Sequence, residues 1–96
     1  MKIYLSGPMK GIPSKNYPTF HKVAAKLREL GHIVYNPAEF KYKGDFPIRK
    51  AFAEYSKFIC EDAEAIVLLP GYQNSTGATA ELHLAKNCGL LIIEWD

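Results

Sequence analysis

The amino-acid sequence predicts an α/β domain built on a parallel sheet of about four strands with helices on both faces. Short segments that are apolar throughout alternate with segments whose apolar residues recur every three or four positions. Strands that are apolar throughout are buried on both faces, and their alternation with helices is typical of a covered parallel sheet. Hydrophobic residues make up 48% of the chain, which suits one small domain over residues 1–96.

The first half of the chain contains two expected strands and one expected helix. Residues 2–5 are β-branched, aromatic or otherwise apolar and run into the turn residues of SGP, so they predict a buried strand. Residues 18–30 predict a helix, because Pro18 suits a first turn, apolar side chains follow at helical spacing, and Gly31 ends the pattern. HIVYNP then predicts a second short strand.

The second half repeats this alternation. AEFKYKGDFP is a polar loop rich in aromatic residues, and a helix that ends near Cys60 follows Pro47. AIVLLP predicts a third strand, residues 76–87 a third helix, and LLIIEW a fourth strand. With right-handed crossovers the four strands take the order 2-1-3-4, which places a topological switch between strands one and three. Ligands of such sheets bind beyond the carboxyl ends of those strands, in the loops that start at Ser6 and Pro70.

The loop SGPMKG supplies the first set of expected ligand-binding residues. Gly7 and Gly11 allow the backbone to approach a ligand closely, and Lys10 offers a mobile cation. Ser6 and Met9 belong to the same predicted binding loop. The spacing fits neither GxGxxG nor a Walker loop, and an ordinary turn explains the residues as well.

The second loop leads into the third helix and supplies an anion site and an acid. Ser75, Thr76 and Gly77 occupy the helix N-terminus, where unpaired N–H groups and the positive end of the dipole favour a phosphate. Ser75 also fits a plain N-cap, and the two roles are compatible. Glu81 follows one turn later, where the helix dipole alone would also accept an acid.

Composition and spacing argue against several other functions. A net charge of +2 is weak for a nucleic-acid binder and suits a small anionic ligand better. Neither the two cysteines nor the three histidines have the spacing of a metal or redox site, so reduced thiols, no metal and no cofactor are expected. The N-terminus has no signal-peptide core or membrane span, which predicts a cytoplasmic protein without membrane contact. The residues concerned are Cys60, Cys88, His21, His32 and His83.

IYLSGPMKG and the later AIVLLPGYQNSTGATAE together resemble the nucleoside 2-deoxyribosyltransferase superfamily, especially its small phage and bacterial members. They are also similar to the deoxynucleoside 5′-monophosphate N-glycosidases, and the resemblance covers nearly the whole chain. It implies that Glu81 is the nucleophile and that Tyr4 lies beside its carboxylate. It further implies that Ser75 contacts a 5′-phosphate and that Lys10 stands at the position of a basic residue in the glycosidases.

One position departs from the family pattern. Family members commonly have an Asp in the second helix, eight residues before the acid that precedes the third strand. Counting back from Glu64 gives Ser56 instead. Asp62 lies toward the wrong edge of the sheet, whereas Asp45, just before the helix, lies on the correct side. Asp45 is therefore the expected replacement acid, and either Asp45 or a substrate-bound water is expected to protonate the leaving base.

The resemblance implies cleavage or transfer at the N-glycosidic bond of a 2′-deoxynucleoside 5′-monophosphate or deoxynucleoside. The alternative, motivated by Ser56, is a module that binds or sequesters a nucleotide without chemistry. The loop before the second helix is either solvated or a lid whose Phe46 or Tyr42 stacks on the base. The expected partners are a small-molecule nucleotide or nucleoside and further copies of the chain, in a homodimer or larger homo-oligomer, but no nucleic acid.

Overall fold

The computed structural model describes residues 1–96 and contains one four-stranded sheet in the order β2-β1-β3-β4, with every pair parallel. The strands are β1 (Lys2–Ser6), β2 (Ile33–Tyr35), β3 (Ala65–Leu68) and β4 (Leu91–Glu94). The helices are α1 (Tyr17–Glu29), α2 (Ile48–Glu61) and α3 (Thr76–Asn87). The predicted α/β fold and strand order are therefore confirmed. None of the helices combines the length and apolar character needed to cross a lipid bilayer.

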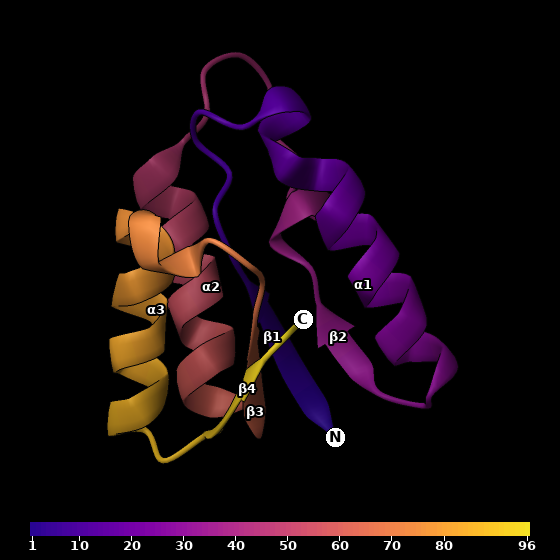
Figure 1. Ribbon diagram of the computed structural model, residues 1–96. Helices are drawn as coiled ribbons and strands as arrows, with labels where there is room; N and C mark the ends of the chain where they lie inside the picture. The colour runs from indigo at the N-terminus through magenta and orange to yellow at the C-terminus, as the bar shows by residue number, and fades with distance from the viewer.

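The sheet lies between two helical layers, with α1 on one face and α2 and α3 on the other (Figure 1). The alternation of side chains along β1 explains the two cores. Ile3 and Leu5 pack in the cluster that contains the apolar residues of α1. Tyr4 packs with α2 and α3 in the second cluster, and Ser6, two residues further, points to the same side. Both hydroxyl groups of β1 consequently face α3.

Three short 3₁₀ turns follow the carboxyl ends of β1, β2 and β3, and the sequence analysis did not predict them. They are η1 (Pro13–Asn16), η2 (Pro37–Glu39) and η3 (Tyr72–Asn74). In η1, Ser14, Lys15 and Asn16 have φ values of 54°, 54° and 62°. Left-handed conformation costs a non-glycine residue about 1–2 kcal/mol. The turn is held in part by Asn16, whose Nδ2 donates to the Pro8 carbonyl at 2.9 Å.

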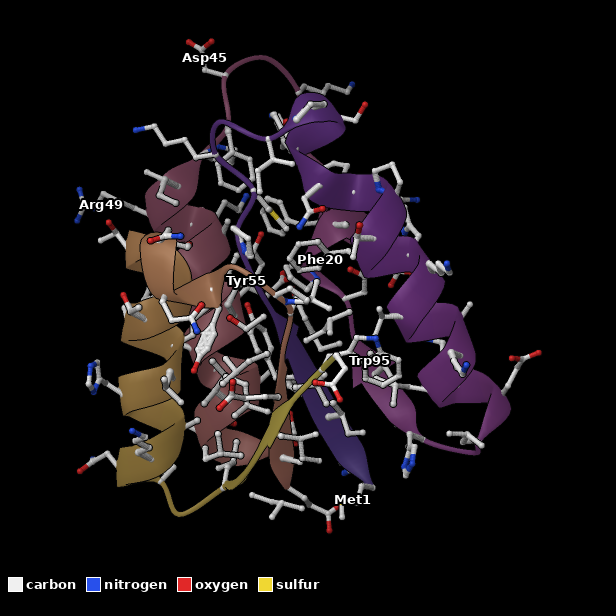
Figure 2. The ribbon with its side chains drawn as sticks, viewed as in Figure 1. Met1, Phe20, Asp45, Arg49, Tyr55 and Trp95 are labelled. Carbon is white, nitrogen blue, oxygen red and sulfur yellow. The ribbon has the colours of Figure 1, made fainter.

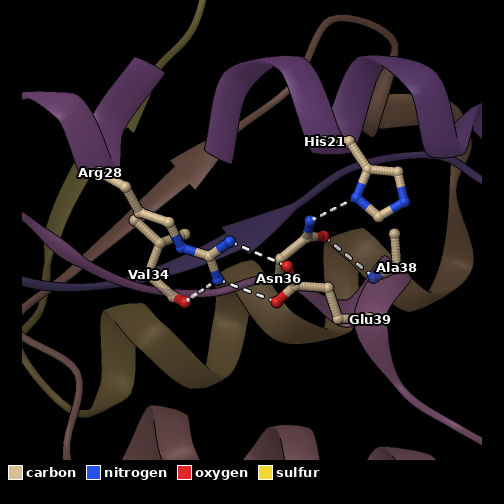
Figure 3. A network of polar contacts seen from close by, with 6 residues as sticks. All are labelled: His21, Arg28, Val34, Asn36, Ala38 and Glu39. Atoms are coloured by element: carbon tan, nitrogen blue, oxygen red, sulfur yellow. Dashed lines mark hydrogen bonds and ion pairs between the residues drawn. The ribbon is translucent and has the colours of Figure 1, made fainter. Parts of the chain in front are cut away.

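A polar network fastens α1 to the segment that follows β2 (Figure 3). The Arg28 guanidinium donates to both Glu39 carboxylate oxygens, at 2.8 and 2.9 Å, and to the Val34 carbonyl at 2.8 Å. Arg28 thereby holds the pKa of Glu39 below its usual value. The buried Asn36 amide lies 3.2 Å from Nδ1 of His21. These contacts hold the β2 side of the sheet in place. The candidate site lies instead at the carboxyl ends of the two central strands, β1 and β3.

Candidate active site

A buried carboxyl group with two hydroxyl donors lies where β1 meets α3. The Glu81 side chain is on the inner face of α3, and the residue is only 6% exposed. The Tyr4 hydroxyl donates to Oε2 of Glu81 at 2.8 Å, and the Ser6 hydroxyl donates to Oε1 at 2.7 Å. Each carboxylate oxygen thus has its own donor, which fixes the orientation of the group.

The surroundings of Glu81 leave its carboxyl group partly protonated and partly ionised near neutral pH. Burial raises the pKa of Glu81 to about 7, although the hydrogen bonds from Ser6 and Tyr4 act in the opposite direction. Burial and the neighbouring Glu81 raise the pKa of Tyr4 well above its usual value, so Tyr4 remains a donor. The single ion pair of the chain joins Arg28 to Glu39 and does not involve this carboxyl group. A carboxyl group in this setting can be either a base or an acid near pH 7.

Glu81 lines a cavity of about 620 Å³, a volume within the usual range for small-molecule sites. One wall is the loop after β1, from Gly7 to Ile12, and another is the segment 74–78 at the start of α3. The side chains that complete it from α2 and the loop before it are apolar or aromatic: Phe46, Ile48, Phe52 and Tyr55. The cavity therefore combines an apolar wall, a polar wall and one carboxyl group.

The start of α3 forms a corner of this cavity that can accept an anion. Ser75 is the N-cap, and its Oγ accepts the backbone N–H of Ala78 at 3.1 Å. The hydroxyl hydrogen of Ser75 remains free to donate to a ligand. Thr76 and Gly77, in the first turn, and Lys10, from the other loop, line the same cavity. The predicted N-cap is confirmed, and it is compatible with an anion at the helix terminus.

The backbone of the loop after β1 explains why two of its positions, Gly7 and Gly11, are glycine. A Cβ atom on Gly7 would lie 2.7 Å from Cβ of the buried Leu69, so only glycine lets the loops after β1 and β3 pack together. Gly11 has a φ of +82°, in the left-handed region that glycine adopts freely. Both glycines also line the cavity. By contrast, a Cβ on Gly77 would have no atom closer than Oγ of Ser75 at 4.0 Å.

Most of the predicted site residues meet at this cavity. Those that line it are Tyr4, Gly7, Met9, Lys10, Gly11, Ser75, Thr76, Gly77 and Glu81. Ser6 does not line the cavity but reaches Glu81 directly, as described above. No group of three or more His, Cys, Asp or Glu side chains is arranged to hold a metal ion.

Asp45 is the predicted site residue that the fold does not bring to Glu81. It is exposed at the outer bend of the loop before α2, directed away from the body of the molecule (Figure 2). Asp45 does not line the cavity, and neither do Ser56 and Asp62. The loop before α2 starts at the correct edge of the sheet but extends outward from it, so Asp45 does not reach the site. Glu81 is the one acidic residue that lines the cavity.

Sequence reasoning missed Lys15, which also lines the cavity. Its ammonium donates to the Tyr42 hydroxyl at 2.8 Å and lies 5.4 Å and 5.7 Å from the ring centroids of Tyr42 and Phe46. Phe46 lines the cavity, and the ring of Tyr42 packs edge to face against it, with 5.0 Å between the ring centroids. Lys15 reaches this place through the left-handed turn η1. No local pattern in the sequence signals that turn.

The comparisons with known proteins place the chain in one family. Residues 1–94 match the family model of DUF4406, which is described as a domain of unknown function, and the chain belongs to that family. A search of curated proteins finds no match.

Proposed function

We propose that this member of the DUF4406 family cleaves or transfers the N-glycosidic bond of a 2′-deoxynucleoside 5′-monophosphate, or of a deoxynucleoside, with Glu81 as the nucleophile. One observation carries the proposal: a buried carboxylate with a hydroxyl donor on each oxygen shares a cavity with the N-terminus of α3. The resemblance of both loops to the nucleoside 2-deoxyribosyltransferase superfamily supports the same reaction.

The chemistry of the N-glycosidic bond explains why one oriented carboxylate would suffice to start its cleavage. Cleavage passes through an oxocarbenium-like state, which a carboxylate stabilises or captures. An oxygen of Glu81 bonds to the anomeric carbon as the bond from that carbon to the base nitrogen breaks, and the departing nitrogen takes a proton from a substrate-bound water. Tyr4 and Ser6 hold the carboxylate for this attack. Water then releases the sugar in a hydrolase, and a second base releases it in a transferase.

The polarity of the cavity favours a phosphorylated substrate. Ser75 and Glu81 are six positions apart, which corresponds to about 9 Å along an α-helix. Both residues line the cavity, so one ligand could place its phosphate at the start of α3 and its anomeric carbon near Glu81. Lys10 and the N–H groups of the first turn would hold the phosphate. The apolar wall that contains Phe46 and Phe52 would receive the base.

A second candidate function is nucleotide binding without chemistry. It is favoured by the absence of a second acid among the residues that line the cavity. Glycosidases and related enzymes normally use a second group to protonate the leaving base. In this alternative Glu81 would accept a hydrogen bond from a sugar hydroxyl, and the protein would sense or sequester its ligand.

The test is release of free base from a panel of nucleosides and their monophosphates. Glu81→Gln keeps the size of the side chain and is expected to lower turnover at least about 100-fold, because it removes the attacking group. Nucleotide binding, measured by calorimetry, should remain. Glu29→Gln, on the exposed side of α1, is the matched control and should keep the wild-type rate.

Two outcomes separate the candidates. Wild-type turnover by Glu81→Gln would refute the nucleophile assignment. Micromolar binding by the wild-type protein without any product across the panel would refute the enzymatic proposal and support the binding module.

A further inference from the structure

Two cysteines that are remote in the sequence lie side by side at the end of the molecule away from the cavity. Cys60 is in the last turn of α2, and Cys88 is the C-cap of α3. They are 28 positions apart, yet their Sγ atoms are separated by only 3.9 Å. The residues of α2 and α3 that line the cavity lie in the first half or at the middle of these helices: Ile48, Phe52, Tyr55, Thr76, Gly77, Ala78 and Glu81.

Both thiols are free, and both residues are exposed to solvent. This exposure is unusual, because free cysteine is among the most buried residue types. Packing in the core therefore does not explain why either position is a cysteine. Two accessible thiols in contact are instead the arrangement that thiol–disulfide exchange requires.

We propose that Cys60 and Cys88 are a modification site at which a reversible intramolecular disulfide joins the ends of α2 and α3. The sulfur atoms must approach from 3.9 Å to about 2.05 Å. Exposed side chains can rotate to allow this. Cys88 also lies at the end of its helix, next to Gly89 with a φ of +77°, so the backbone there is not confined within a helical turn.

The co-reactant is a low-molecular-weight disulfide such as oxidised glutathione. The thiolate of one cysteine attacks the glutathione disulfide, whose S–S bond breaks and releases one glutathione thiolate. The thiolate of the other cysteine then attacks the protein sulfur of the mixed disulfide and releases the second. The two protein thiols lose two protons and two electrons, and the glutathione disulfide gains them. Desolvation and the neighbouring Cys88 raise the pKa of Cys60, so the reaction should be faster above neutral pH.

The bond would close a loop that contains β3, η3 and the whole of α3, and therefore Glu81. Cross-links of this kind restrict the unfolded chain and stabilise the fold. For a loop of this length in a domain of this size, the midpoint of thermal unfolding should rise by about 15 °C or more.

The experiment treats the reduced full-length protein with a series of oxidised-to-reduced glutathione ratios and follows it by intact mass, peptide mapping and thermal unfolding. The wild type is expected to lose the mass of two hydrogen atoms and to yield one cross-linked Cys60–Cys88 peptide. Thermal stability should rise, and all changes should reverse with a reducing agent. Cys60→Ser and Cys88→Ser are the matched controls, and each should stop at the mixed disulfide, with the added mass of one glutathione.

Three results would overturn the proposal. The first is a wild type that accumulates two glutathione adducts without losing hydrogen. The second is a disulfide formed only between two chains. The third is a cross-linked protein that melts at or below the temperature of the reduced one. The thermal unfolding of each untreated serine variant is measured as a reference, so a folding defect caused by the substitution itself would be recognised.

Discussion

The Tyr4 hydroxyl lies 2.8 Å from a carboxylate oxygen of Glu81, although 77 positions separate the two residues. Tyr4 is fully buried, and its ring packs against Tyr35 with 5.6 Å between ring centroids. The contact joins the first strand of the chain to its last helix. The orientation of the Glu81 carboxylate therefore depends on a residue that belongs to the core.

Replacing Tyr4 by Phe keeps the buried ring and removes the hydrogen bond to Glu81. That hydrogen bond lowers the pKa of Glu81, so its loss should raise the pKa above about 7. The carboxylate is the attacking form, and the acidic limb of kcat/KM against pH should therefore move to higher pH. Tyr35→Phe is the control, because the Tyr35 hydroxyl donates to Glu54 instead. An acidic limb at the same pH in Tyr4→Phe and wild type would contradict the role of Tyr4.

Glu81 should make the protein less stable as the pH rises toward neutrality. Its pKa is about 7 in the fold, against 4.5 for an unperturbed Glu, so the folded state binds more protons between these values. The free energy of unfolding therefore falls as the pH rises through this window and is constant above it. The difference is on the order of 3 kcal/mol. Denaturant unfolding at about pH 5 and about pH 8 measures it.

Glu81→Gln is the reference for this comparison, since Gln does not titrate. The wild type should lose stability relative to the variant between the two pH values. Equal pH dependence in the two proteins would show that Glu81 has an ordinary pKa.

Ser75→Asp separates the capping role of Ser75 from its proposed phosphate role. Asp is as good an N-cap as Ser, so stability should stay within about 0.5 kcal/mol of wild type. Its negative charge would repel a phosphate at the start of α3. The dissociation constant of a deoxynucleoside monophosphate should rise at least about tenfold, whereas that of the matching nucleoside should not change. An equal effect on both ligands, measured by calorimetry, would place the phosphate elsewhere.

A pair of Gly→Ala variants tests which glycine the fold requires. Gly7→Ala puts a methyl group 2.7 Å from Cβ of Leu69 and should cost about 1–3 kcal/mol of stability. Gly77→Ala meets no close atom and lies in the first turn of α3, so it should not lower stability. Chemical denaturation of the two variants provides the measurement. Equal stability of both variants would mean that the loops after β1 and β3 adjust freely.

The arrangement of strands and helices could be predicted from the sequence because it depends on hydrophobic periodicity and short connections. The meeting of the loops after Ser6 and Pro70 at one cavity followed from the same argument, since parallel strands end at a common edge, whereas the place of Tyr4 beside Glu81 was implied by the family resemblance alone. Asp45 shows the limit of that argument. The edge at which a loop begins is fixed by topology, but the direction of its outer bend is not. The expected homo-oligomer stays a prediction.

The turn η1 and the cysteine pair could not be predicted from the sequence, because they depend on contacts that leave no local sequence pattern. Three consecutive left-handed residues, Ser14 to Asn16, contradict ordinary backbone preferences and occur alongside the bond from Asn16 to Pro8. The place of Lys15 follows from that turn. The proximity of Cys60 and Cys88 depends on where two helices end and how they pack, and their separation in the sequence carries no sign of it.

The carboxyl group and its two donors are held by a central strand and a helix, whereas much of the cavity wall comes from the connections after β1 and β2. Substitutions at positions of those connections that the fold does not require would reshape the cavity without moving the carboxyl group. The scaffold thus separates the elements that orient Glu81 from the loops that shape the space around it.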